Sequence, residues 1–187
     1  VALEEELKAT LSLAGGEYSF TGIMDRIDRR DDLLHILDYK TGSLKLHDGS
    51  LWGDILYFRR IESLFAALRQ TQTGGGYEPD AQMLEDMDAL FEELRPRLPS
   101  LQLPCYVSMA VGSGLGPVGD AALVELRDAG REYPLFGGLV DEDLAEAIGY
   151  CHSALSLVLL HMRHAPSFTA RPDRHCDWCP YASLCAE

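Results

Sequence analysis

Residues 21–43, TGIMDRIDRRDDLLHILDYKTGS, constrain the fold more than any other part of the chain. Apolar and polar side chains alternate over residues 20–28 and again over 33–39, and turn-forming residues separate the two runs. This pattern predicts a β-hairpin. A turn closed on Asp31 and Asp32 sets a register in which the numbers of paired residues add up to 63.

That register places Asp25 opposite Asp38, on a face that also carries Lys40. Like charges that oppose each other directly on a sheet are destabilising, and burial without a partner adds a further cost. A divalent cation bound by both carboxylates removes both penalties and leaves room for a phosphate. The alternative is an ordinary solvent-exposed hairpin. The same register predicts that this face also carries Ile23, Ile27, Leu34 and Ile36.

Two motifs in the hairpin resemble the nuclease core of the PD-(D/E)xK superfamily, in particular the RecB/AddB-type exonuclease domains of helicase-nucleases. They are Gly22-x-x-Asp25-Arg26-Ile27-Asp28 and Leu37-Asp38-Tyr39-Lys40-Thr41-Gly42. The resemblance implies that Asp25, Asp38 and the backbone carbonyl of Tyr39 bind Mg²⁺ or Mn²⁺, and that Lys40 supports catalysis. Asp28 has the opposite parity, and we expect it to be structural.

A second polar pair follows in residues 100–111, which are predicted to form a short helix. Gln102 and Tyr106 are four residues apart and therefore share one helix face. Such a pair is common, but Leu101-Gln102-Leu103-Pro104-x-Tyr106 is similar to the Q-x-x-x-Y motif of RecB-like nucleases. The resemblance implies that Gln102 and Tyr106 face the active site and position the DNA strand.

Three of the five cysteines lie close together in the tail, as Cys176-x2-Cys179-x5-Cys185. This spacing suits iron–sulfur or zinc ligation. It is also similar to the tail of AddB-type domains, which implies a four-iron–four-sulfur cluster completed by a cysteine upstream of the first strand. No cysteine precedes Cys105 here, so we expect the cluster in the full-length protein and its absence from this chain alone. Cys105 and Cys151 are predicted to be small buried residues.

The charge balance argues against a DNA-binding protein of the basic-patch kind, because the formal net charge is −14. A metal-dependent nuclease tolerates such a charge better, since bound cations invert the local field. The five cysteines and the absence of a signal peptide favour a cytoplasmic location. No apolar run approaches the roughly 20 residues that span a membrane. The acidic start at Val1, without Met, predicts a fragment of a longer protein.

These patterns predict an α/β fold, and the resemblance implies a restriction-endonuclease-like core. Its mixed sheet begins with an antiparallel meander, in which residues 3–13 form a strand with Leu3, Glu5 and Leu7 on one face. We expect one domain over 1–187, with a helical insertion at about 50–98 and a cysteine-bearing tail at 166–187. The further elements predicted are helices at 53–70 and 79–94, a buried strand at 121–127, a short irregular strand at 133–140 and a helix at 141–164 with Asp141 as its N-cap.

The expected function is that of a divalent-metal-dependent DNA nuclease. By resemblance it is an exonuclease that acts with a helicase in recombination or double-strand-break repair, so its partners are DNA and a helicase domain or subunit. One alternative is a catalytically inactive nuclease-fold module that binds DNA or scaffolds a helicase complex. Another is a zinc-ribbon-like protein-interaction domain built on the cysteine tail, which lacks a fourth ligand.

Overall fold

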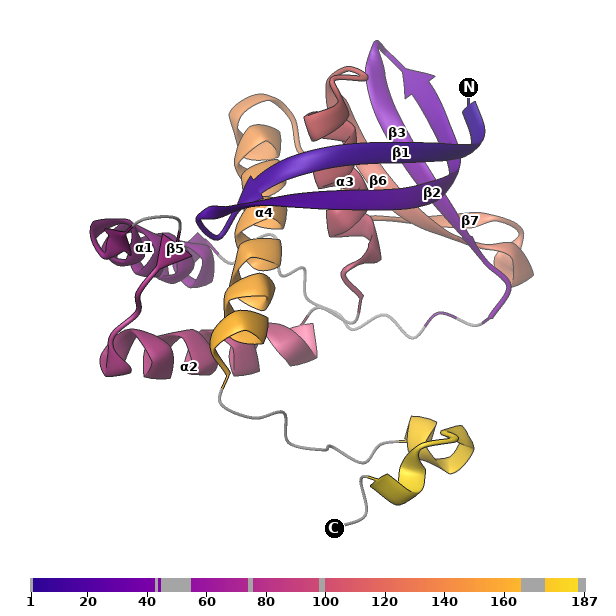
Figure 1. Cartoon of the computed structure of the whole chain (residues 1–187). Coiled ribbons are helices and arrows are strands. Elements are labelled where there is room, and N and C mark those ends of the chain that lie inside the picture. The colour runs from indigo at the N-terminus through magenta and orange to yellow at the C-terminus, as the bar shows by residue number, and fades with distance from the viewer. Residues whose placement is uncertain are drawn as a thin grey trace.

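A computed structural model describes residues 2–42, 44, 55–73, 76–97, 100–165 and 174–184 of the chain (Figure 1). The strands are β1 Ala2–Leu13, β2 Gly16–Arg30, β3 Leu33–Lys40, β4 Gln72–Thr73, β5 Gly76–Tyr77, β6 Val118–Glu125 and β7 Arg131–Pro134. The helices are α1 Ile55–Gln70, α2 Ala81–Arg97, α3 Gln102–Ser113 and α4 Asp141–His164. Short 3-10 segments are η2 Leu126–Asp128, η3 Arg174–Trp178 and η4 Ala182–Leu184.

The main sheet has five strands in the order β1-β2-β3-β6-β7. β1, β2 and β3 form the predicted antiparallel meander, β6 pairs with β3 in parallel, and β7 closes the sheet antiparallel to β6. A parallel pair needs a long crossover, which is supplied here by the chain from 41 to 117 with its helices. The predicted mixed α/β fold is therefore confirmed.

The β2–β3 hairpin has the register expected from its alternation. Ile27 pairs with Ile36 and Arg26 with Leu37, so the numbers of paired residues add up to 63. Asp31 and Asp32 have φ angles of 49° and 65°. Positive φ at both central residues is the signature of the two-residue turn whose twist matches that of the flanking strands, and Asp tolerates this conformation.

The meander bends at Glu4 and Asp25. Because of this bend, part of the face predicted for the hairpin is wrong. Glu4 has a φ of 50°, and the pairing of β1 with β2 skips Glu4 and Asp25. Both Met24 and Ile27 are buried in the same core, although a regular strand sends residues three apart to opposite faces. As a result Ile23 is 59% exposed rather than facing the core.

The same bend explains why β1 departs from prediction at its start. Leu7 is buried, as are Ala9, Leu11 and Leu13 further along the strand. Leu3 has the same parity as Leu7 but is 66% exposed, so the prediction that it shares the face of Leu7 is wrong. Glu5 is also exposed, but it lines a hollow together with Ile27 and Leu34 of the core, which agrees with the predicted face. The left-handed backbone at Glu4 shifts the alternation there, a change that a simple count of two residues per repeat cannot anticipate.

One continuous hydrophobic core joins the inner face of the sheet to the helices. α3 packs on β1, β2, β3 and β6, while α4 packs on β1, α3, α1 and α2 (Figure 1). α4 is long and apolar enough to cross a membrane by length and composition, but much of it is buried inside the fold. Phe58 of α1 stacks on Tyr150 of α4 with ring centroids 4.0 Å apart, so α1 belongs to this core.

The boundaries of the remaining elements differ from prediction by a few residues. The strand predicted at 121–127 runs from Val118 to Glu125, and the irregular strand expected at 133–140 is β7. Asp141 is the first residue of α4, but Val140 occupies the N-cap position and no side chain caps the helix. Asp141 has a φ of 50°, which is not the extended conformation in which an N-cap side chain reaches back to the helix.

Candidate active site

The strands β2 and β3 separate where the first predicted carboxylate lies. Their pairing ends at Arg26 and Leu37, although β3 continues to Lys40. In place of a backbone carbonyl from β2, the Oδ2 atom of Asp25 accepts the hydrogen bond of the Tyr39 N–H at 2.8 Å. The prediction of Asp25 directly opposite Asp38 in a regular ladder is therefore wrong in detail, but the Asp25 carboxylate lies against the backbone next to Asp38.

Asp38 is almost completely buried, with 3% of the residue exposed. Its Oδ1 atom accepts a hydrogen bond from Nε2 of Gln102 at 2.7 Å. Its Oδ2 atom lies 2.6 Å from Nζ of Lys40, as an ion pair. Within the described residues, no donor makes a well-directed hydrogen bond to this buried Oδ2 atom. Because this oxygen has an ion pair but no hydrogen bond, a metal cation can still bind it.

Gln102 links the lysine to the carboxylate. Its Oε1 atom accepts a hydrogen bond from Lys40 Nζ at 2.8 Å, while its Nε2 atom donates to Asp38. Tyr106, one turn further along α3, lies 3.0 Å from that Nε2 atom and donates to the carbonyl oxygen of Ile23 at 2.8 Å. The structure thus brings Gln102, Tyr106, Lys40 and Asp38 together, as the i, i+4 spacing predicted for the helix.

Gly22 makes room for this arrangement. A Cβ atom at Gly22 would lie 3.3 Å from Cε1 of Tyr106 and 3.4 Å from Cε of Met109. α3 therefore packs closely against β2 at the glycine, and the Tyr106 hydroxyl reaches the backbone beyond it. The role of this glycine was not predicted, although it begins the first motif.

The oxygen atoms gathered here suit a small hard cation. Asp25 and Asp38 supply carboxylates at the end of the β2–β3 pairing, and the Tyr39 carbonyl lies between Asp38 and Lys40 along the chain. In the described part of the chain, no group of three or more His, Cys, Asp and Glu side chains converges on one point. Mg²⁺ does not need such a group, because it keeps several waters and is often bound by one or two carboxylates.

The opposite face of the sheet carries a separate network of charges. Asp28 accepts a hydrogen bond from Nε of Arg26 at 2.7 Å and lies 3.6 Å from Arg30. Arg30 also makes a bidentate contact with Glu132 of β7, at 2.9 and 3.0 Å. The Arg26 hydrogen bond holds the pKa of Asp28 below its ordinary value, and Arg30 does the same for the pKa of Glu132. This placement agrees with the structural role expected for Asp28.

The cysteine predictions are only partly covered by the structure. Cys176 and Cys179 lie in the described tail, where the N–H of Cys179 donates to the Cys176 carbonyl at 3.2 Å. Cys185, the third predicted cluster ligand, lies outside the described residues. Cys151 is fully buried and Cys105 is half-buried. Burial raises the pKa of both thiols, which disfavours the thiolate form that binds metals.

Three histidines, His152, His161 and His164, lie along α4. His161 Nδ1 lies 3.0 Å from Asp88 Oδ1, and its ring stacks on Phe91 with centroids 3.9 Å apart. Burial lowers the pKa of His152 and of His164.

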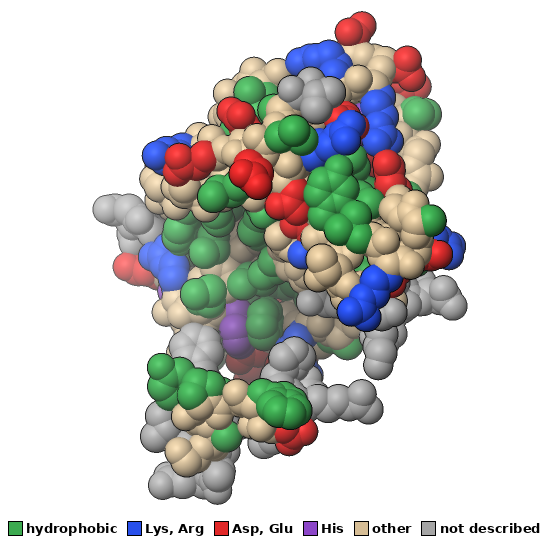
Figure 2. Space-filling view, turned by 90° about the vertical axis from the view of Figure 1, so that its right-hand side faces the viewer, with side chains coloured by type: hydrophobic (Ala, Val, Ile, Leu, Met, Phe, Trp, Pro, Cys, Tyr) green, Lys and Arg blue, Asp and Glu red, His purple; other side chains and the backbone are tan. Residues whose placement is uncertain are grey.

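Basic side chains form no continuous surface on the face shown in Figure 2, where Lys and Arg lie in small groups beside Asp and Glu.

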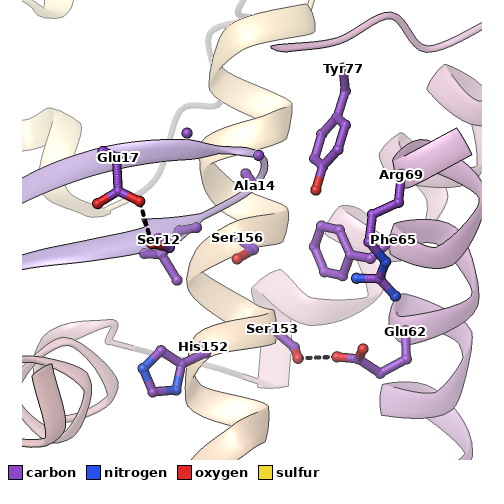
Figure 3. A pocket seen from close by; sticks show the side chains of 13 residues that line it. Ser12, Ala14, Glu17, Glu62, Phe65, Arg69, Tyr77, His152, Ser153 and Ser156 are labelled. Atoms are coloured by element: carbon purple, nitrogen blue, oxygen red, sulfur yellow. Dashed lines mark hydrogen bonds between the residues drawn. The ribbon is translucent and has the colours of Figure 1, made fainter. Parts of the chain in front are cut away.

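A hollow of about 550 Å³ lies at the far end of the β1–β2 hairpin (Figure 3). α1 and α4 form its other walls, and the Tyr77 ring covers Gly15 in the turn. Its carboxylates already have partners, because Ser153 donates to Glu62 and Ser12 to Glu17. None of the residues predicted to be catalytic lines it. The candidate active site is therefore the network where β2 and β3 separate.

Among the residues that the structure describes, Glu125 is a buried carboxylate near this network that was not predicted. It ends β6, it is the register partner of Lys40 in β3, and only 7% of the residue is exposed. Its Oε2 atom accepts a hydrogen bond from the Tyr133 hydroxyl at 3.1 Å. The sequence signal for Glu125 was a glutamate at the end of a run of apolar residues, AALVE. Secondary-structure prediction alone does not single out such a residue.

Comparison with known proteins identifies one family. A sequence profile described as the PD-(D/E)XK nuclease superfamily matches residues 1–56 and 77–186, which is most of the chain. The unmatched stretch, 57–76, contains most of α1 together with β4. No curated protein and no solved structure matches the chain.

Proposed function

The chain belongs to the PD-(D/E)XK nuclease superfamily, and from this premise we propose that it is a divalent-metal-dependent DNA nuclease whose active site is the network around Asp38. Enzymes of this superfamily are generally metal-dependent nucleases. The observation that carries the proposal is the contact of one lysine with a buried carboxylate, at the place where a second carboxylate reaches the same backbone.

In this proposal Asp25, Asp38 and the Tyr39 carbonyl hold Mg²⁺ or Mn²⁺. The bound ion supplies positive charge to the scissile phosphate and lowers the pKa of the attacking water. Lys40 presents a fixed ammonium to the negative charge that develops on the phosphate. Gln102 keeps Lys40 and Asp38 at a set separation, and Tyr106 anchors Gln102 to β2. Both residues thereby orient the groups that the DNA strand meets.

The finer proposal is an exonuclease in the cytoplasm that acts with a helicase in recombination or double-strand-break repair. The RecB/AddB-like motifs around Asp25, Asp38 and Gln102 support it, as does the cysteine spacing of the tail. A helicase partner also accounts for the acidic surface, because its own DNA-binding track brings the strand to the site. Cys176, Cys179 and Cys185 then ligate an iron–sulfur cluster in the complete protein.

Cleavage of DNA with Mn²⁺ tests the nuclease proposal. We expect Asp38→Asn and Lys40→Ala each to lower the initial rate by about a hundredfold or more, because each removes charge at the reacting phosphate. Asp28→Asn is the matched control, since Asp28 is also buried but lies on the opposite face of the sheet. Equal rates for all four proteins would refute the proposed chemistry. Binding of DNA without cleavage by the wild type would favour the scaffolding module.

The choice of substrate ends tests the exonuclease proposal. A linear duplex should be degraded in the presence of the helicase partner, while a covalently closed circle should survive. Nicking of the circle at a similar rate would indicate an endonuclease.

Iron and acid-labile sulfide assays on the complete protein test the cluster. Cys179→Ser should release the iron, whereas Cys105→Ser should retain it, because Cys105 lies in α3 with a raised thiol pKa. A complete protein free of iron and sulfide would contradict this part of the proposal.

A further inference from the structure

Glu125 is a buried carboxylate with few partners for its charge. Its Oε2 atom accepts the Tyr133 hydroxyl at 3.1 Å, and its Oε1 atom lies 3.4 Å from the N–H of Leu44. Both donors are neutral, and the second contact is long. In the described part of the chain, Glu125 forms no ion pair, although buried carboxylates are normally paired with a cation or fully hydrogen-bonded.

The nearest lysine along the sheet is Lys40. The parallel register of β3 and β6 pairs Lys40 with Glu125, and Asp38 with Leu123, so these side chains leave the sheet on the same face. Neighbouring strands lie about 4.8 Å apart, and a lysine side chain spans that separation easily. Lys40 therefore has two acidic neighbours on this face, Asp38 on its own strand and Glu125 on the next.

At present Lys40 is on the Asp38 side, 2.6 Å from Oδ2 of Asp38. A divalent cation held by Asp38 and the ammonium of Lys40 repel each other and compete for the same oxygen atom. Binding of the cation therefore favours movement of the ammonium away from Asp38. Gln102 contacts Lys40 from the α3 side and can follow only part of that movement, because its amide also bonds Tyr106.

We propose that Glu125 is a positioning residue for Lys40, which accepts the Lys40 ammonium when a divalent cation occupies Asp38. This inference rests on the proposed function. The Tyr133 hydroxyl holds the Glu125 carboxylate in place on the β7 side. Glu125 thus lowers the cost of metal binding and keeps the Lys40 ammonium directed toward the phosphate.

A double-mutant cycle on Mn²⁺ affinity, measured by calorimetry without DNA, tests this role. Glu125→Gln keeps the size of the side chain and an acceptor for Tyr133, but removes the charge. We expect it to weaken Mn²⁺ binding by about tenfold, as loss of an outer-sphere partner does. In a Lys40→Ala background the same change should have little effect, because the ammonium that Glu125 receives is gone.

Two further variants separate positioning from a structural role. Glu125→Asp retains the charge and should keep most of the Mn²⁺ affinity, which gives a second measure if Glu125→Gln is poorly folded. Tyr133→Phe removes the other partner of Glu125 and should change the melting temperature more than the Mn²⁺ affinity. A loss of affinity from Glu125→Gln that persists in the Lys40→Ala background would overturn the inference.

The outcomes also distinguish this inference from the proposed function. A wild type that binds Mn²⁺ through Asp38 and cleaves DNA, with Glu125→Gln unchanged in affinity, would overturn the inference alone. A wild type that binds no Mn²⁺, or an Asp38→Asn variant that binds it equally well, would overturn both.

Discussion

The side-chain amide of Gln102 is bonded at both of its ends within the candidate site. Its oxygen accepts from Lys40, and its nitrogen donates to Asp38 and contacts the Tyr106 hydroxyl. An amide is suited to this place because it carries an acceptor and two donors on one planar group. A carboxylate in its place would repel Asp38, and an ammonium would repel Lys40. At the scale of single residues, Gln102 is therefore the group that sets the geometry of the D-x-K motif.

Replacement of Gln102 by Leu should lower the rate of Mn²⁺-dependent DNA cleavage by about tenfold to a hundredfold, with the fold retained. The loss follows because Lys40 and Asp38 would no longer be held at a set separation. Initial rates on a linear duplex measure the effect. Gln82→Leu is the control, since Gln82 is exposed and donates a hydrogen bond to Asp86 within α2, away from the site. Equal rates for both variants would show that the Gln102 bridge is dispensable.

A methyl group at Gly22 should displace Tyr106, because the added Cβ would lie 3.3 Å from the tyrosine ring. We expect Gly22→Ala to cost about 1–3 kcal/mol in the free energy of unfolding and to slow cleavage. Gly149→Ala in α4 is the control with the opposite sign. No atom lies within 4 Å of its added Cβ, so it should stabilise the helix by about 0.5–1 kcal/mol. Urea denaturation measures both, and a stabilised Gly22→Ala variant would contradict the packing described.

At the scale of elements, β2 carries charged side chains on both faces of the sheet. The bend at Asp25 turns one carboxylate toward the Tyr39 backbone of β3, while Arg26, Asp28 and Arg30 remain on the opposite face. The second set joins β2 to β7 through the bidentate contact of Arg30 with Glu132. This division places Asp25 and Asp28, two acidic residues of one strand, in separate networks.

The network on the opposite face should make stability depend on pH. The pKa of Asp28 is lowered on folding, mainly by the hydrogen bond from Arg26. A lowered pKa contributes stability that is present above the unfolded value, near 3.9, and is lost as the pH falls through the folded value. The free energy of unfolding of the wild type should therefore exceed that of Asp28→Asn at pH 6, and the difference should shrink below about pH 4.

Urea titrations from pH 3 to pH 7 measure this difference. Asp32→Asn is the control, because Asp32 is exposed in the hairpin turn and Asn tolerates its positive φ angle. A difference between wild type and Asp28→Asn that stays constant over the whole range would contradict the role of the Asp28 charge.

At the scale of the whole molecule, one core joins the family-matched part of the chain to α1, most of which lies outside the match. Phe58 and Ile61 of α1 are fully buried, and Phe58 stacks on Tyr150 of α4. The helical insertion expected at about 50–98 stays a prediction. α1 itself is an integral part of the folded domain.

Phe58→Ala should therefore destabilise the protein by about 3–5 kcal/mol, as the loss of a fully buried aromatic ring does. Leu56→Ala is the matched control on the same helix, because Leu56 is 73% exposed, and it should change stability by less than about 0.5 kcal/mol. Denaturant unfolding compares the two. A small effect from Phe58→Ala would show that α1 packs only loosely on α4.

Much of the fold and of the site was predictable because it depends on local patterns. Alternation and a two-residue turn determine the register of β2 with β3, and the i, i+4 spacing puts Gln102 and Tyr106 on one face of α3. These are properties of a strand and of a helix, whatever they pack against. The motif around Asp38 was recognisable for the same reason, since its residues are adjacent in the chain.

The tertiary structure decided what depends on contacts between distant segments. The bend at Glu4 and Asp25 reverses the predicted exposure of Leu3 and Ile23, because the pairing of two strands and not the pattern of either one sets the alternation there. Glu125 was missed because the parallel pairing of β6 with β3 brings it beside Lys40, although the two residues are 85 positions apart in the chain. The sequence by itself therefore determined the hairpin, the α3 face and the choice of chemical groups. Only the folded chain brought Gln102 onto Asp38 and Glu125 beside Lys40, since such contacts arise from packing and leave no periodic signal in the sequence.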